Sequence, residues 1–131
     1  MNRIIRPVAR AIALLLAGSL GSQAFAVCND ITFSFDNTTG TMIRVIKVRY
    51  FDATTGVSSN RVVSKDCFDT YTCVTPATNL GPVAPGDNIA SVRFQYRPWV
   101  GGGWGAAIWT GVNATVVPQC VDHRNYGTWA I

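Results

Sequence analysis

The chain of 131 residues is poor in the side chains on which enzyme chemistry depends. It has no glutamate, and His123 is its only histidine. The neighbouring Asp122 is badly placed to orient that imidazole, because adjacent residues of a strand point to opposite faces. No G-x-S-x-G motif offers a nucleophile. We therefore expect no catalytic residue, predict that His123 lies in a surface loop, "CVDHRNYG", and predict that the protein is not an enzyme.

Motifs for metals and phosphates are also missing. The spacing of Cys67 and Cys73 is not a zinc-finger pattern, and disulfide pairing would consume the thiolates that zinc requires. The turns "DATTG" and "PGDN" lack the regular acidic spacing of a calcium loop. The glycine run 101–103 is not followed by Lys and Ser or Thr, as a phosphate-binding loop would be. The sequence predicts no metal and no other cofactor.

Apart from its first residues, the chain has no long apolar run. Residues 1–26 combine a basic front with the apolar stretch "AIALLLAGSL" and the small-x-small sequence "AFA", which is typical of a signal peptide. The apolar stretch is shorter than the roughly 20 residues that span a bilayer. We predict cleavage after Ala26, which leaves one domain, residues 27–131. The form of the leader would suit a bacterium, so we expect a secreted or periplasmic protein.

The residues after the leader predict no membrane anchor in the cleaved chain. A lipid anchor on Cys28 is disfavoured because Val27 stands where a small residue should precede the modified cysteine. Asn37 and Asn113 open N-x-T sequons, which matter only if the protein passes through an endoplasmic reticulum.

Positive charge is scarce once the leader is removed. The whole chain has a net charge of +4, but the leader holds three of the eleven basic residues and none of the seven acids. The remaining domain therefore carries a net charge of +1. Its only lysines are Lys47 and Lys65, and its arginines are scattered along the sequence. A nucleic-acid-binding domain concentrates such residues on one face, so we expect no nucleic-acid partner.

The domain is also poor in helix-forming residues and rich in Thr, Val, Gly and aromatics. Short alternating runs recur between turn residues, and Ile31, Phe33 and Phe35 share one face of the run "ITFSFDN". This spacing predicts an all-β fold, a small antiparallel β-sandwich of about seven to nine short strands.

Most expected strands can be placed by their alternation; the segment 68–88 is turn-rich and harder to assign. In "MIRVIKVRYFD" the Ile and Val residues stand at odd-numbered positions up to Val45 and at even-numbered positions from Ile46 onward. This change indicates either a strand with both faces covered or a β-bulge. The strands that we expect cover residues 31–37, 42–52, 57–67, 89–99, 104–111, 114–120 and 127–131.

Four cysteines, Cys28, Cys67, Cys73 and Cys120, follow the leader, and an even number in an exported chain predicts two disulfides. Pairing Cys67 with Cys73 and Cys28 with Cys120 would close a local loop and tie the two ends of the domain together. The other two pairings stay open.

The most distinctive stretch is "FQYRPWVGGGWGAAIW", residues 94–109, which predicts a hairpin around three glycines. If the loop is 100–103, Trp99 faces Trp104, and both share a face with Arg93, Gln95 and Arg97. This arrangement would form an aromatic tip above a polar row.

If the loop is 101–103 instead, a slip of one residue inverts every assignment on the second strand. Trp104 then turns toward the core, and Trp109 turns outward. Trp99 points outward in both registers, and with a single register at most two of the three tryptophans face outward.

The function that the sequence favours is binding. We expect an exported module that recognises a glycan or an exported protein at the hairpin tip, because exposed Trp and Arg are concentrated in recognition surfaces. The candidate binding residues are Arg93, Gln95, Arg97, Trp99 and Trp104. The alternative is a structural component of the cell surface that assembles through exposed strand edges. The sequence does not predict the oligomeric state.

Overall fold

A computed structural model describes residues 26–114 and 119–131, and within these ranges the chain forms nine β-strands and no helix. The predicted all-β fold is therefore confirmed. Residues 1–25 of the predicted signal peptide lie outside the described residues, as do residues 115–118 of the predicted strand 114–120. The strands are β1 (Cys28–Asp36), β2 (Ile43–Asp52), β3 (Val57–Cys67), β4 (Thr72–Val74), β5 (Thr78–Leu80), β6 (Ile89–Pro98), β7 (Ile108–Trp109), β8 (Asn113–Ala114) and β9 (Asn125–Ala130).

The smaller sheet is built around β1. Strands β4 and β9 flank β1 on opposite sides, since both pair with Phe35 and Asp36, and β5 pairs with the beginning of β1. The β1–β9 pairing is parallel, whereas β4 and β5 run antiparallel to β1. The turn-rich segment therefore supplies two strands, β4 and β5, that are too short to show alternation.

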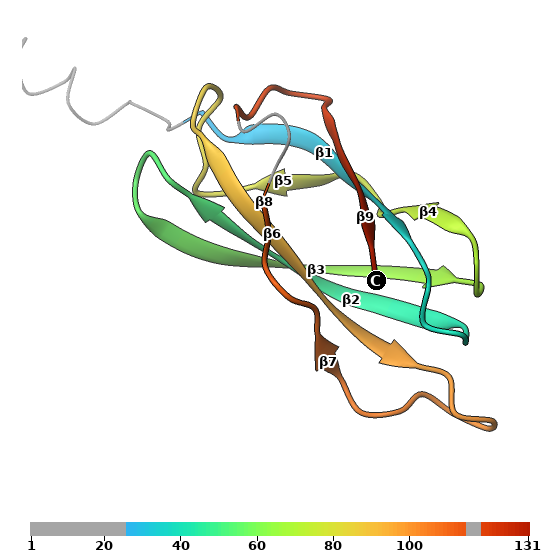
Figure 1. Ribbon diagram of the computed structural model, residues 1–131. Coiled ribbons are helices and arrows are strands. Elements are labelled where there is room, and N and C mark those ends of the chain that lie inside the picture. Colours follow the sequence, from blue (N-terminus) through green and yellow to red (C-terminus); the bar gives the residue numbers. More distant parts are fainter. Residues whose placement is uncertain (1–25, 115–118) are drawn as a thin grey trace, which may run out of the picture.

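The larger sheet has the order β3–β2–β6–β7, and β8 also pairs with β6. β2 lies between β3 and β6 and pairs with both antiparallel along its whole length. In Figure 1, the smaller sheet lies above the larger one, and the β6–β7 hairpin extends beyond the smaller sheet at the lower right.

A β-bulge in β2 explains the change of parity in its sequence. The pairing with β6 shifts by one residue between Val45 and Lys47, so Ile46 is the extra residue. Val45 is buried before the shift and Val48 after it, and the pairing with β3 shifts at the same place. The bulge keeps the apolar side chains of both halves of β2 on the core face, and of the two explanations considered it is the correct one.

The core between the sheets is largely aromatic. Phe33 and Phe35 of β1 meet Phe94 of β6 at ring-centroid distances of 6.2 and 5.6 Å. Tyr126 and Trp129 of β9 also contact Phe33, and Trp129 lies 5.8 Å from Phe94. Side chains from β1, β6 and β9 thus interdigitate, which joins the two sheets.

The parallel approach of β9 to β1 requires a glycine. Gly127 has a φ angle of +133°, and a β-carbon at this position would clash with the carbonyl oxygen of Ser34. A side chain at residue 127 would push β9 away from β1.

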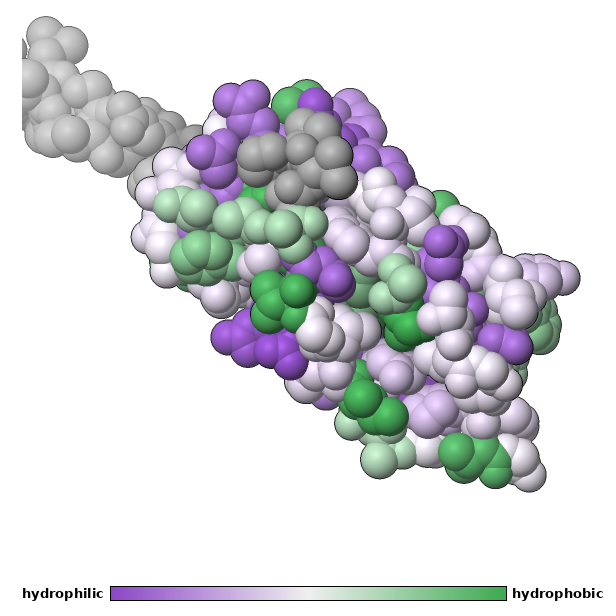
Figure 2. All heavy atoms as spheres, viewed as in Figure 1, coloured by the Kyte–Doolittle hydropathy of each residue, from purple (hydrophilic) through white to green (hydrophobic). Residues whose placement is uncertain are grey.

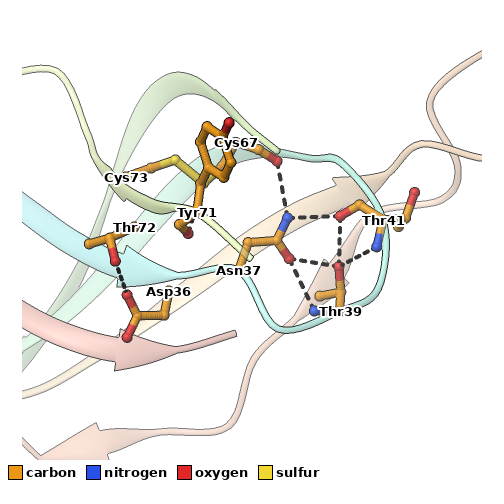
Figure 3. The surroundings of a disulfide bond; sticks show 8 residues. All are labelled: Asp36, Asn37, Thr39, Thr41, Cys67, Tyr71, Thr72 and Cys73. Atoms are coloured by element: carbon orange, nitrogen blue, oxygen red, sulfur yellow. Dashed lines mark hydrogen bonds between the residues drawn. A yellow bond between two sulfur atoms is a disulfide. The ribbon is translucent and has the colours of Figure 1, made fainter. Parts of the chain in front are cut away.

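Of the three pairings that the sequence left open, the structure has the one with a local loop and a bond between the two ends of the domain. Cys28 is bonded to Cys120, 92 residues away, and Cys67 to Cys73, six residues away. The second bond closes the loop between β3 and β4, next to the buried side chain of Asn37 (Figure 3). Two disulfides are consistent with an oxidising environment.

Candidate binding face on the larger sheet

The side of the larger sheet that points away from β1 carries an unusual set of side chains. Residues of β2 and β6 that alternate with buried core residues project from this side, and the return strand of the hairpin adds tryptophans. We call this side the arginine–tryptophan face. Its members are Arg44, Lys47, Arg49, Arg93, Gln95, Arg97, Trp99, Trp104 and Trp109.

The hairpin uses both of the registers considered from the sequence. At its tip Trp99 pairs with Trp104 around the loop 100–103, in which Gly101 and Gly102 have positive φ angles of 79° and 157°. Nearer its base, Gln95 pairs with Trp109 and Tyr96 with Ile108, which is the other register. Residues 105–107 contain the extra residue between the two.

This change of register overturns the expectation that at most two of the tryptophans face outward. A single register cannot place all three on one side, but one extra residue between Trp104 and Trp109 restores the parity of Trp109. Trp109 contacts Arg93 and Trp104 contacts Arg44, and both arginines project from the outer side. Trp99, Trp104 and Trp109 therefore all lie on the arginine–tryptophan face.

A series of side-chain contacts that starts on β3 holds the tip of the β6–β7 hairpin in place. Asp66 accepts two hydrogen bonds from Arg44, of 2.6 and 2.9 Å. These bonds lower the pKa of Asp66, so its carboxylate stays charged. The guanidinium carbon of Arg44 lies 4.5 Å from the ring centroid of Trp104, and Trp104 meets Trp99 edge to face at 5.2 Å. Trp99 is the last residue in this series of contacts, and it is 37% exposed.

A second stack lies nearer the middle of the sheet. The guanidinium carbon of Arg93 is 4.9 Å from the ring centroid of Trp109, and Gln95 stands beside Trp109 on the neighbouring strand. Arg97 is exposed and pairs with Arg44 across β2 and β6. The five residues expected to form a site therefore share one face, and the structure adds Trp109 to them.

The fold also brings together on the arginine–tryptophan face basic residues that lie far apart in the sequence. Five of the eight basic residues after position 26 lie on the arginine–tryptophan face, although the arginines are scattered along the chain. Among the described outward positions of β2, β3 and β6, Asp66 is the only acid. Arg44, Lys47 and Arg49 were missed as candidates because the parity of β2 changes at the bulge. Assigning the bulge from the alternation of β2 would have revealed them.

Apolar surface is not continuous on the side of the molecule that Figure 2 presents. Apolar residues form separate small groups there among pale and hydrophilic ones. The described residues on that side therefore form no broad apolar patch.

His123 lies where the sequence placed it, in an exposed turn. Its side chain is 75% exposed, and Nδ1 is 3.0 Å from a carboxylate oxygen of Asp30. The described residues contain no group of three His, Cys, Asp or Glu residues that could hold a metal ion. They also include no helix long and apolar enough to cross a membrane.

Comparison of the chain with known proteins identifies no relative. No protein family, no curated protein and no solved structure matches it.

Proposed function

We propose that the protein is an exported binding module that recognises a glycan through its arginine–tryptophan face. The observation that carries the proposal is the placement of three tryptophans on one side of a sheet, next to hydrogen-bonding side chains. Flat indole rings offer stacking surfaces for the apolar faces of sugar rings. Gln95 and the arginines offer donors for sugar oxygens.

The length of this face supports a chain of sugars as the ligand. From Arg93 to Trp99 the strand runs about 20 Å, at the usual rise per residue. A single sugar ring would cover only a part of that length. The two disulfides support an extracellular or periplasmic location, where polysaccharides are abundant.

The central test is the replacement of Trp99, the most peripheral ring of the tip. Trp99→Ala should weaken polysaccharide binding about tenfold or more, as the loss of an aromatic anchor in a binding surface commonly does. Isothermal titration calorimetry against a panel of neutral and charged polysaccharides measures the effect.

Phe68→Ala is the matched control. Phe68 is an exposed aromatic residue in the loop between β3 and β4, outside the arginine–tryptophan face. This variant should bind as the unchanged protein does. If the two variants bind equally well, or if an exported protein is bound in place of any glycan, the proposed function is wrong.

Assembly through strand edges is the second candidate. β3 is an edge strand of 11 residues, and Val62 is strongly exposed on it. However, Arg61 and Lys65 of β3 pair with the buried Val48 and Val45 and so point to the inner side, where charged side chains oppose edge pairing. Arg61 also donates hydrogen bonds to the carbonyl oxygens of Asn79 and Gly81. Concentration-dependent polymers in light scattering, unaffected by Trp99→Ala, would favour assembly over binding.

A further inference from the structure

We propose that the glycan is anionic, a polysaccharide of sugar acids, and that Arg49 and Arg93 bind its carboxylates in a groove beside Trp109. The proposal rests on the proposed glycan-binding function and specifies its ligand class. Its basis is a groove on the outer side of the larger sheet in which positive charge has no acidic partner among the described residues.

Two arginines stand next to each other in this groove. Arg49 of β2 and Arg93 of β6 are direct cross-strand neighbours, and both line a groove of about 260 Å³. Phe51 and Val112 provide apolar walls, and the described lining has no acid. The remaining lining residues are Tyr50, Ser58 and Ser91.

The charge of these arginines is not balanced within the described part of the chain. Like charges directly opposite each other on neighbouring strands destabilise a sheet. The buried Nε atom of Arg93 has no hydrogen-bond partner among the described residues, although buried donors normally have one. Arg44, by contrast, is satisfied by Asp66. An anion in the groove would relieve this repulsion and accept hydrogen bonds from the two guanidinium groups that line it.

The chemistry of the groove fits a carboxylate. The planar guanidinium binds a carboxylate through two parallel hydrogen bonds, which gives arginine a geometric preference that a lysine lacks. The hydroxyl groups of Ser58 and Ser91 can donate further hydrogen bonds to a ligand oxygen.

The groove and the tryptophans form one continuous surface. Arg93 lines the groove and also lies over Trp109, which stands beside Gln95 toward the hairpin tip. A sugar acid could therefore place its carboxylate in the groove while the next sugars of the chain lie along the tryptophans. A neutral sugar would leave the arginine charges unbalanced.

A nucleic acid is also an anion, but the observations favour a polysaccharide. The residues after position 26 carry a net charge of only +1, whereas nucleic-acid-binding domains are usually strongly basic overall. The two disulfides are also consistent with an oxidising environment, such as the space outside the cytoplasm.

The experiment compares matched polysaccharides that differ only in charge. Polygalacturonate, polyglucuronate and alginate are titrated into the disulfide-bonded protein by calorimetry, beside carboxyl-reduced forms of the same chains. At least one acidic chain should bind about tenfold or more tightly than its reduced form, and this preference should fall with added salt.

Substitutions then test whether Arg49 causes the preference for acidic over carboxyl-reduced polysaccharides. Arg49→Gln should remove most of the difference between the acidic and reduced chains, and Arg49→Lys should restore part of it, since lysine keeps the charge without the planar fork. Arg49 is exposed, so neither change should impair folding. Lys65→Gln, which removes a charge from the inner side of the same sheet, should leave the preference intact.

The outcomes separate this inference from the proposed function. Equal binding of acidic and reduced chains, or an unchanged preference in Arg49→Gln, overturns the anionic ligand and leaves glycan binding standing. Failure to bind any glycan, acidic or neutral, overturns both. A single-stranded oligonucleotide that binds more tightly than every polysaccharide also overturns the inference.

Discussion

Asn37, the residue that follows β1, is completely buried although its side chain is polar. Its Oδ1 atom accepts hydrogen bonds from the backbone and the hydroxyl of Thr39, and Nδ2 donates to the carbonyl oxygens of Thr41 and Cys67 (Figure 3). One amide thus joins the β1–β2 turn to the end of β3. Because the amide is enclosed and fully engaged, the sequon at Asn37 cannot carry a glycan in the folded protein.

Replacing this amide should be costly. Asn37→Ala removes the four hydrogen bonds of a fully buried amide, including its donor to the carbonyl oxygen of Cys67, so we expect the free energy of unfolding to fall by about 3 kcal/mol. Urea denaturation followed by circular dichroism measures the change. Asn60→Ala, on an exposed position of β3, is the control and should change stability by less than about 0.5 kcal/mol. Equal stabilities of the two variants would contradict the role given to Asn37.

Individual residues differed in how well the sequence predicted them. The burial of Ile31, Phe33 and Phe35 follows from alternation alone and is confirmed. The burial of Asn37 could not be predicted in the same way, because it depends on a carbonyl group of β3 that lies 30 residues further along the chain. Long-range hydrogen bonds leave no periodic signal in the sequence.

At the scale of elements, two turns meet at one end of the larger sheet. Asp52 ends β2 and is only 2% exposed, and its carboxylate accepts hydrogen bonds from the backbone of Thr54 and Thr55. Thr54 in turn accepts a hydrogen bond from the backbone of Asn88, just before β6. Burial of Asp52 raises its pKa, and the neighbouring carboxyl group of Asp87 raises it further.

This raised pKa predicts how stability depends on pH. A folded state with the higher pKa binds the proton more tightly than the unfolded chain does. The contribution of Asp52 is therefore greatest below the pKa of an unfolded aspartate, about 4, and it is lost as the pH rises through the folded-state pKa. Asp52→Asn should remove this loss and raise the free energy of unfolding at pH 7 by about 1 kcal/mol.

Urea denaturation at several pH values between 4 and 8 tests the prediction. Asp122→Asn, which changes an exposed aspartate away from both turns, should keep the pH dependence of the unchanged protein. If the free energy of unfolding of Asp52→Asn fell with rising pH as steeply as that of the unchanged protein, Asp52 would not be the source of the pH dependence. The ion pair of Asp66 acts in the opposite sense, because its lowered pKa removes stability only as the pH falls.

Strands could be predicted from the sequence where apolar and polar residues alternate over enough positions to show a period of two. The runs in β1, β2, β3 and β6 predicted those strands, and even the bulge in β2 left a visible change of parity. β4 and β5 have three residues each, too few for a period of two to appear. The extra residue in 105–107 was hidden because glycine and alanine show no preference for either face.

At the scale of the whole molecule, the two disulfides should differ in their importance. The bond between Cys28 and Cys120 encloses most of the domain, whereas the bond between Cys67 and Cys73 closes a short loop. Cross-linking a longer loop removes more entropy from the unfolded chain. Serine replacement of the long-range pair should therefore cost about 4 to 5 kcal/mol, and that of the local pair about 2 kcal/mol.

Thermal and urea unfolding of the two double variants under non-reducing conditions measures this order. Each variant keeps the other disulfide and so serves as the control for general effects of losing cysteine. A larger loss from the local pair would mean that the loop between β3 and β4 stabilises the native state in a way that chain entropy does not describe.

The architecture of the whole molecule was more predictable than its surface. Alternation and turn spacing suffice to predict a β-sandwich, because they report which side of each strand is buried. They do not report which strands become neighbours. The pairing of Arg49 with Arg93 is a property of β2 lying beside β6, and no local pattern contains it.

The stacking of arginines on indole rings also has an optical consequence. Arg93 lies over Trp109 and Arg44 over Trp104, so two of the four tryptophans have a cation against the ring. A nearby charge shifts the energy of the excited indole, and an anion that draws a guanidinium away changes that charge. The protein therefore carries its own spectroscopic label, placed on the surface where we expect the ligand to bind.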